Sequence, residues 1–245
     1  MGTNERLRGS LAAVGLRPAD LAEAVQVDAK TVERWITKGR VPHRLHRVAA
    51  AKCLAVEESY LWPELVNDPL TQTASQAEFL QLYPTRGAVS TDTWNQLFAG
   101  AHEAIDLLFY AGTHLFENDL IGTLARKAAE GVHCRVLIGD ETSDAVRQRA
   151  VEEGTTGGLE GRIQLHRLYL RALRGMAGIE VRAHGTTLYN SLYRFDQDLL
   201  VNTHAFGAPA GLSPFLHLRR VPGGRLWDHY MQSFDEVWKR AEPEA

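Results

Sequence analysis

The sequence lacks the features that mark membrane, secreted and disulfide-rich proteins. Its 245 residues contain no run approaching the ~18 apolar residues of a membrane-spanning helix, and the opening MGTNERLRGS has no apolar secretory core. There are two cysteines, Cys53 and Cys134, and their spacing fits neither CxxC nor a Cys/His metal motif. We therefore expect a cytoplasmic protein with no membrane partner, in which both thiols are reduced and lie in the core.

Lysine is also scarce, with 5 of the 27 basic residues, and this arginine bias is associated with GC-rich bacterial genomes. Residues 1–66 hold 10 basic against 8 acidic side chains, whereas residues 67–245 hold 17 against 22. The positive charge is concentrated between Lys30 and Lys52, where seven basic residues accompany one acidic residue, Glu33, for a net charge of +6. Such a patch favours phosphate groups, although a solvated basic face is the alternative.

The chain divides near residues 62–76, WPELVNDPLTQTASQ. Pro63 and Pro69 bracket this polar stretch, which has no sustained periodicity and is typical of a linker. We interpret residues 1–66 as one domain, residues 67–78 as the linker and residues 79–245 as a second domain.

The first domain is predicted to be all-α. Apolar residues at helical spacing predict helices near residues 5–14, 18–25, 29–39, 41–56 and 57–65. Asp28 can cap the third of these helices, and Gly39 can end it. Two short helices joined by the tight turn QVD, the second ending at glycine, indicate a helix-turn-helix.

The stretch LAEAVQVDAKTVERWITKGRVP, residues 21–42, resembles the lambda-repressor-like (XRE) family of DNA-binding domains. The resemblance covers about residues 5–66 and implies that the third helix enters the major groove of double-stranded DNA. Lys30, Thr31 and Arg34 would then meet base edges, with Glu33 also facing outward. The residues expected to hold phosphates are Lys38, Arg40, His43 and Arg44. A helical hairpin that serves protein contacts is the alternative.

The second domain alternates helices and strands. Helical patterns at residues 93–104, 120–131 and 161–175 separate apolar, strand-length runs at residues 105–112, 133–140 and 179–185. This alternation predicts an α/β domain with a largely parallel sheet. Ligands of such sheets bind at the carboxyl ends of the strands. The side chains at those ends are Thr113, His114, Asp140, Glu141 and His184.

The segment LYNSLYRFDQDLLVN, residues 188–202, reads as a strand, a turn at DQD and a second strand. This order resembles the phospholipase D superfamily, whose motif is H-x-K-x4-D followed by G-S-x-N. With Asp196 as the anchor, Tyr189 stands at the histidine position and Ser191 at the lysine position. Asn202 and Thr203 stand at the Gly-Ser positions, and Ala205 stands at the asparagine. The resemblance therefore rests on the order of elements across residues 79–245, and it implies a phospholipase D-like sandwich.

The departures from the motif predict that phosphodiester chemistry is lost. In the resembled family the histidine attacks phosphorus, and the lysine neutralises the phosphate charge. A tyrosine of pKa about 10 is a poor nucleophile at neutral pH, and a serine offers no charge. The resemblance thus implies no catalytic residues and a cavity that can still bind an effector. The residues expected to bind it are His114, His184, Tyr189, Ser191, Asn202 and His204.

Other motifs are weak. No HxH, HxxxH or Cys/His cluster predicts a metal, and nothing predicts a cofactor. The glycine-rich GTTGGLEG, residues 154–161, lacks the Gly-Lys-Ser/Thr of a phosphate-binding loop and is predicted to be a flexible loop or lid. The arginines of the basic helix could be solvated, or one or two could reach over the cavity to an anionic effector. They are Arg162, Arg167, Arg171 and Arg174.

The sequence therefore predicts a bacterial one-component transcription regulator of the nucleoid. The phospholipase D resemblance implies a homodimer, because members with a single motif pair two half-motifs, and a dimer would also match two recognition helices to a palindromic operator. One alternative is a phosphodiesterase or nuclease that its N-terminal domain recruits to DNA. Another is an antitoxin or phage-type repressor in which the second domain is an oligomerisation module.

Overall fold

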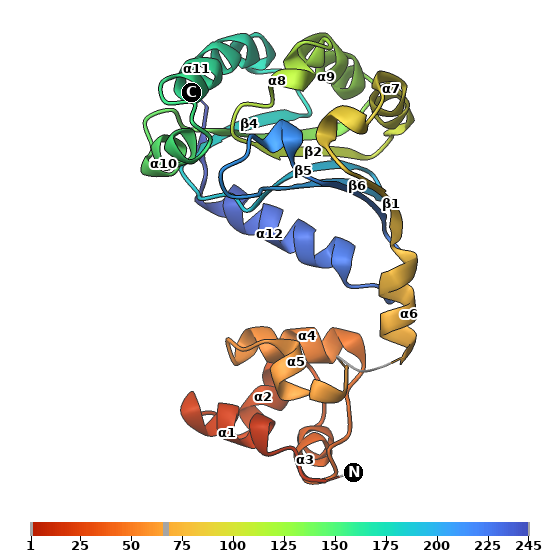
Figure 1. Cartoon of the computed structure of the whole chain (residues 1–245). Helices are drawn as coiled ribbons and strands as arrows, with labels where there is room; N and C mark the ends of the chain where they lie inside the picture. The colour runs from red at the N-terminus through yellow and green to blue at the C-terminus, as the bar shows by residue number, and fades with distance from the viewer. Residues whose placement is uncertain (1, 66–68, 245) are drawn as a thin grey trace. The chain divides into compact units, whose positions relative to one another are not determined.

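The computed structural model describes residues 2–65 and 69–244 (Figure 1). The chain forms two compact units, Met1–Gln72 and Thr73–Ala245. Residues 66–68, where the first domain was expected to end and the linker to begin, lie outside the described residues. Helix α6 (Pro69–Ala77) occupies most of the remaining expected linker. The polar composition of this segment hid the helix, since none of its residues is buried.

The N-terminal unit is built from short helices. They are α1 (Glu5–Ala13), α2 (Pro18–Ala24), α3 (Ala29–Thr37), α4 (Arg44–Cys53), α5 (Glu58–Leu61) and the 3-10 turn η1 (Pro63–Leu65). The Asp28 carboxylate caps α3 by accepting the Lys30 N–H at 2.8 Å. Trp35 and Trp62 meet edge-to-face in a core that also holds Leu7 and Leu21. This core stabilises helices that are too short to persist alone in water.

The C-terminal unit surrounds a sheet in the order β1-β7-β6-β5-β2-β3-β4-β8. Its strands are β1 (Phe79–Tyr83), β2 (Ala104–Phe109), β3 (His133–Gly139), β4 (Ile179–His184), β5 (Asn190–Phe195), β6 (Asp198–Thr203), β7 (Phe215–Arg219) and β8 (Glu242–Pro243). Its helices are α7 (Thr91–Gly100), α8 (Thr113–Phe116), α9 (Leu120–Ala129), α10 (Asp144–Glu152), α11 (Gly158–Leu170) and α12 (Leu226–Arg240). Short 3-10 turns lie at η2 (Arg86–Ala88), η3 (Arg171–Leu173) and η4 (Ala210–Leu212).

The sheet is mixed, which corrects the expectation of a largely parallel one. The pairs β2–β3 and β3–β4 are parallel. The pairs β5–β2, β6–β5, β7–β6, β1–β7 and β4–β8 are antiparallel. The strands that alternate with helices along the chain are the parallel ones. Strands β5, β6 and β7 follow one another with no α-helix between them, and such connections join antiparallel neighbours.

Two layers of helix cover the sheet. Helices α7 to α11 lie on one face and α12 lies on the other (Figure 1). Helix α11 begins at Gly158, so residues 154–157 of the glycine-rich stretch form a loop as predicted, whereas residues 158–161 form the first turn of a helix. Cys134 is buried in β3, but Cys53 is exposed at the end of α4, contrary to the expectation that both thiols lie in the core. Burial raises the pKa of the Cys134 thiol to about 11.

A charged triad fixes the face of the sheet that α12 covers. Asp106 of β2 stands directly between Arg135 of β3 and Arg194 of β5 in the strand register. Its carboxylate accepts hydrogen bonds from Arg135 Nε at 2.6 Å and Arg194 Nη1 at 2.8 Å. The Arg135 guanidinium stacks over Trp238, and that of Arg194 lies over Trp227. Both tryptophans belong to α12, so the triad connects three strands to the helix.

The register brings the ends of several strands to one edge of the sheet. Strand β5 runs antiparallel to β2, so its beginning at Asn190 lies beside the carboxyl end of β2. Asn190 pairs with Thr203 at the end of β6, and Phe215 at the start of β7 pairs with Tyr83 at the end of β1. The segments that follow β1, β2 and β6 therefore meet the start of β5.

Candidate functional site

The exposed face of α3 carries cations without partners. Lys30 and Arg34 project from α3, and Lys38 and Arg40 follow it. All four are exposed, and none makes a side-chain hydrogen bond or ion pair with another described residue. Three other arginines of this unit are paired, Arg8 with Glu5, Arg17 with Asp20 and Arg47 with Glu58. The unpaired cations are therefore the ones available to an external anion.

The remaining predicted DNA-binding residues lie around the same helix. Glu33 is exposed on α3, and Thr31 is half-buried in its first turn. His43 and Arg44 are exposed at the start of α4. An open groove of about 720 Å³ runs along α3, lined by Lys30, Glu33, Arg34, Arg8 of α1 and Arg17 at the start of α2. Arg8 and Arg17 were not among the residues predicted from the sequence.

A cavity of about 300 Å³ lies in the C-terminal unit where the strand ends meet. His114 of α8, Ser191 of β5 and His204, which follows β6, line it together, as their places in the sequence predicted. Tyr193 and Arg86 line it as well. Arg86 lies in η2, after β1, and neither that strand nor its role was predicted. This is the best-supported ligand site, because segments far apart in the sequence supply polar groups to one cavity.

Ser191 and His204 form the centre of this cavity. The Ser191 Oγ lies 3.0 Å from His204 Nε2, and His204 Nδ1 lies 3.2 Å from the Leu188 carbonyl oxygen. A carbonyl oxygen can only accept a hydrogen bond, so Nδ1 carries the proton and Nε2 accepts the Ser191 hydroxyl. Burial, reinforced by Arg149, lowers the pKa of His204 to about 4, so the imidazole is neutral at pH 7.

Arg86 supplies the positive charge of the cavity. The guanidinium lies beside Gly211, where an added Cβ would come within 3.0 Å of Nη2. Burial raises the pKa of the Tyr193 phenol, while the nearby Arg86 and Ser191 act in the opposite direction. Three other charged residues line the cavity. Arg162 and Glu117 are exposed and opposite in charge, and Glu153 accepts a hydrogen bond from Arg149. Of the basic helix, Arg162 thus reaches the cavity.

His114 is half-buried and packs against Trp94, with ring centroids 5.1 Å apart, and both of its ring nitrogens are shielded from solvent. Neither of its ring nitrogens has a hydrogen-bond partner among the described residues. Burial, together with the charge of Arg86, lowers its pKa to about 3. A buried polar group without a partner destabilises the fold, so His114 stands out as a side chain that a ligand or a small movement could satisfy.

Three other predicted effector residues lie outside the cavity lining. His184 is buried, with Nε2 3.2 Å from the Phe109 carbonyl oxygen, and burial lowers its pKa to about 4. Asn202 is fully buried, and its amide nitrogen donates to the Pro214 carbonyl oxygen at 3.3 Å. Tyr189 is 80% exposed, just before β5. His184 and Asn202 are bound to the backbone, which sequence spacing alone does not reveal.

Asp196, the anchor of the motif register, is at the far end of β5 from Ser191. It adopts a positive φ of 50° in the turn before β6. Its carboxylate accepts the backbone N–H groups of His102, Glu103 and Ala104 at 2.8–2.9 Å. Burial raises its pKa, but these hydrogen bonds and Arg194 outweigh that effect and lower it overall. Asp196 thus ties the turn to the start of β2, and it is not among the residues that line the 300 Å³ cavity.

Of the other strand-end residues expected at the site, Thr113 lines the cavity, whereas Asp140 and Glu141 form an ion-pair cluster. Arg167 of α11 binds Glu141, approaches Asp140 at 3.7 Å, and pairs with Glu244 at 2.5 Å. The cluster joins the end of β3 to α11 and to the C-terminal segment. Asp140 and Glu141 therefore have a structural role.

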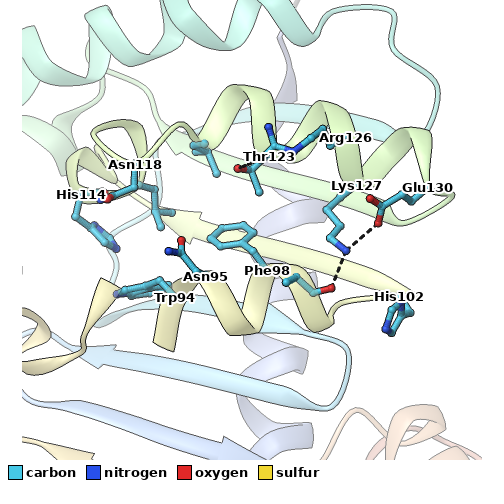
Figure 2. A pocket seen from close by; sticks show the side chains of 13 residues that line it. Trp94, Asn95, Phe98, His102, His114, Asn118, Thr123, Arg126, Lys127 and Glu130 are labelled. Atoms are coloured by element: carbon cyan, nitrogen blue, oxygen red, sulfur yellow. Dashed lines mark hydrogen bonds and ion pairs between the residues drawn. The ribbon is translucent and has the colours of Figure 1, made fainter. Parts of the chain in front are cut away.

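A second cavity, of about 520 Å³, lies between α7 and α9 (Figure 2). Its prominent cation is Lys127, whose ammonium donates to the carbonyl oxygens of Ala99 and Ala101 and to Glu130 Oε2. These bonds use all three ammonium donors and cap the end of α7. The Lys127 ammonium is therefore fully hydrogen-bonded within the protein. The 300 Å³ cavity at the strand ends is the stronger candidate for a ligand site.

Within residues 2–65 and 69–244, no group of three or more His, Cys, Asp or Glu side chains could hold a metal ion. In the same residues, no helix is both long and apolar enough to cross a membrane.

No family model and no curated protein matches the chain. Solved structures that resemble it include TrmBL2, an archaeal chromatin protein with a novel mode of DNA binding, at 15% identity and a TM-score of 0.44, covering 97% of this chain and 92% of that one. Nuc from Salmonella typhimurium, a phospholipase D family member, matches at 12% identity and a TM-score of 0.35, covering 62% and 90%. Phosphatidylserine synthase from Haemophilus influenzae matches at 11% identity and 0.44, covering 66% and 39%.

Proposed function

We propose that the chain is a bacterial one-component transcription regulator that binds operator DNA through its N-terminal unit. The unpaired cations on and after α3 carry this proposal. Lys30, Arg34, Lys38 and Arg40 are exposed without partners in a chain whose net charge is −3. Lys30 and Arg34 lie on the helix that, by the resemblance of residues 21–42 to XRE domains, enters the major groove. Arg8 and Arg17 line the same groove, but both are paired with carboxylates, so the four unpaired cations are the proposed DNA contacts.

The C-terminal unit is proposed to sense a small anion, without phosphodiesterase activity. Arg86 is the charge that the cavity offers, while Ser191, Tyr193 and His204 supply hydrogen bonds. No lysine lines the cavity, and its histidines are His114 and His204, neither of which stands in the H-x-K arrangement of the resembled family. Pairing of two chains would present two recognition helices to two half-sites, so we propose a homodimer in the nucleoid. Light scattering on the full chain checks the dimer.

Replacing Arg34 with Ala is expected to weaken binding to a selected operator by about 1–3 kcal/mol, because a bidentate base contact is lost. Arg40→Ala should instead weaken binding to all sequences alike and flatten the salt dependence, as expected for a phosphate contact. Fluorescence anisotropy on DNA selected from a random pool measures both effects. Arg126→Ala removes an exposed charge from the C-terminal unit and serves as the matched control. Salt-insensitive or undetectable DNA binding by the full chain would contradict the proposal.

Inorganic phosphate, sulfate or acetate at millimolar concentration is expected to stabilise the C-terminal unit, because an anion at Arg86 binds the folded state alone. Arg86→Gln removes the charge and should abolish the shift in Tm. Arg171→Gln, an exposed arginine outside the cavity lining, should leave it intact. Differential scanning calorimetry at constant ionic strength measures the shift. Equal stabilisation of both variants would locate anion binding elsewhere and remove the support for an anionic effector.

A further inference from the structure

The Ser191–His204 pair has the geometry of a nucleophile with its base. The hydroxyl oxygen is 3.0 Å from Nε2, and the Leu188 carbonyl fixes the ring by accepting from Nδ1. A nucleophile, a base within hydrogen-bond reach and a third group that orients the base are the parts that covalent catalysis needs. Ser191 also lines the cavity, so its hydroxyl faces a space that a small molecule can enter.

A cation completes the arrangement. Arg86 lines the same cavity, and its charge acts on Tyr193, the next residue on the Ser191 face of β5. Attack of a hydroxyl on a carbonyl carbon leaves negative charge on the carbonyl oxygen. The half-buried Arg86 guanidinium, already in place beside Gly211, could stabilise such a charge. The cavity thus contains a nucleophile, an unprotonated base and a group for the developing oxyanion.

We propose that Ser191 is acylated by a small carboxylic ester, with His204 as the general base and Arg86 as the oxyanion-stabilising residue. The Ser191 Oγ bonds to the carbonyl carbon as its proton passes to His204 Nε2. The carbon–oxygen bond to the alcohol then breaks, and the alcohol leaves with that proton. Water, deprotonated in turn by His204, attacks the acyl-serine, releases the carboxylic acid and restores the hydroxyl.

This chemistry differs from phosphodiester cleavage and requires neither the histidine nor the lysine of the phospholipase D motif. A cavity of about 300 Å³ is at the small end of ligand sites, so it suits a short acyl chain. The proposal uses the same cavity as the proposed sensor, but its test makes no use of DNA. A slow second step would keep the acyl group on Ser191 and so hold the sensor in its bound state.

The test is covalent labelling of the folded, full-length chain with a short-chain alkyl fluorophosphonate. The Ser191 oxygen bonds to phosphorus, the phosphorus–fluorine bond breaks and fluoride leaves, while the hydroxyl proton passes through His204 to water. Intact mass and peptide mapping are expected to show one adduct, on Ser191. His204→Gln keeps a hydrogen-bond acceptor but not a base, and it should slow labelling about 100-fold.

Ser90→Ala is the matched control, since this hydroxyl caps α7 and lies outside the cavity lining. Its labelling should equal that of the unchanged protein. Mapping of the unchanged protein requires no variant to fold, so absence of an adduct on Ser191 overturns the proposal. An adduct that forms at the same rate in His204→Gln, or that appears only in urea, overturns it equally. Anion stabilisation by Arg86 can persist in either case, which separates this failure from that of the proposed sensor.

Discussion

Lowering the pH from 7 to 4 is expected to unfold the C-terminal unit. Of three histidines in this unit, His184 is buried and His114 and His204 are half-buried, and desolvation is the main cause that lowers their pKa values to about 4, 3 and 4 respectively. In the unfolded chain each would titrate near pH 6.5. Between about pH 6.5 and 4 the unfolded state therefore binds more protons than the folded state, and proton uptake favours unfolding as the pH falls.

The sign and the window follow from these values. Each histidine stabilises the fold fully above pH 6.5, and this contribution is lost as the pH falls toward the folded-state pKa. At pH 4 the loss is roughly 3 kcal/mol per histidine. Three such losses are comparable to the whole stability of a typical domain, about 5–15 kcal/mol. Asp196 and Asp198, whose pKa values are lowered, add to the loss of stability in the same direction, but mainly below about pH 4, where unfolded carboxyl groups take up protons.

Calorimetry and near-ultraviolet circular dichroism between pH 7 and 4 measure the transition. His114→Leu should move its midpoint to lower pH and raise stability at pH 7, because both unpartnered nitrogens disappear. His133→Gln, at an exposed histidine, should leave the midpoint unchanged. Stability that stays constant down to pH 4 would contradict this prediction. It would mean that the three imidazoles can be protonated in the folded state, through contact with water or a carboxylate. The same His114 variant should respond less to anions if this side chain serves the cavity.

Local patterns in the sequence predicted the N-terminal unit well. Apolar spacing located the helices near residues 5–14, 18–25 and 29–39, because amphipathic faces and caps such as Asp28 act within a few residues. The same reasoning located β2, β3 and β4, whose apolar runs are continuous. It missed α12 and placed a linker where α6 lies. Burial of α12 depends on a sheet face assembled from distant strands, which periodicity in one segment does not show.

The candidate cavity was predicted in part. His114, Ser191 and His204 follow or begin strands, and their convergence follows from the order of elements. Arg86 was missed, because its place depends on β1 pairing with β7 across more than a hundred residues of sequence. Tyr189 was placed by its register to Asp196, yet it is exposed, and Asp196 ties a turn at the other end of β5. Aligning a sequence to a motif assigns residues to motif positions, but it does not show where their side chains point, because that depends on packing.

Replacing Asp106 with Ala is expected to destabilise the C-terminal unit by about 3 kcal/mol, the cost of taking a buried carboxylate away from two half-buried arginines. Asp106 is 1% exposed and accepts from both Arg135 and Arg194, so its removal leaves two guanidinium groups on the strands that flank β2. These cations would repel each other and loosen their stacking on the tryptophans of α12. Urea denaturation followed by the fluorescence of those tryptophans measures the change.

Matched variants separate the triad from the loss of a surface charge. Asp235→Ala removes the exposed partner of Arg135 and should cost less than about 1 kcal/mol, as exposed ion pairs do. Asp106→Leu combined with Arg135→Met and Arg194→Met should be more stable than Asp106→Ala alone, since no buried charge is left unpaired. If the triple variant is instead less stable than the single one, the arginines contribute mainly through their stacking on α12. The triad would then serve mainly to position the arginines against α12. In that case the loss of unfolding free energy in Asp106→Ala should be nearly as small as that in Asp235→Ala.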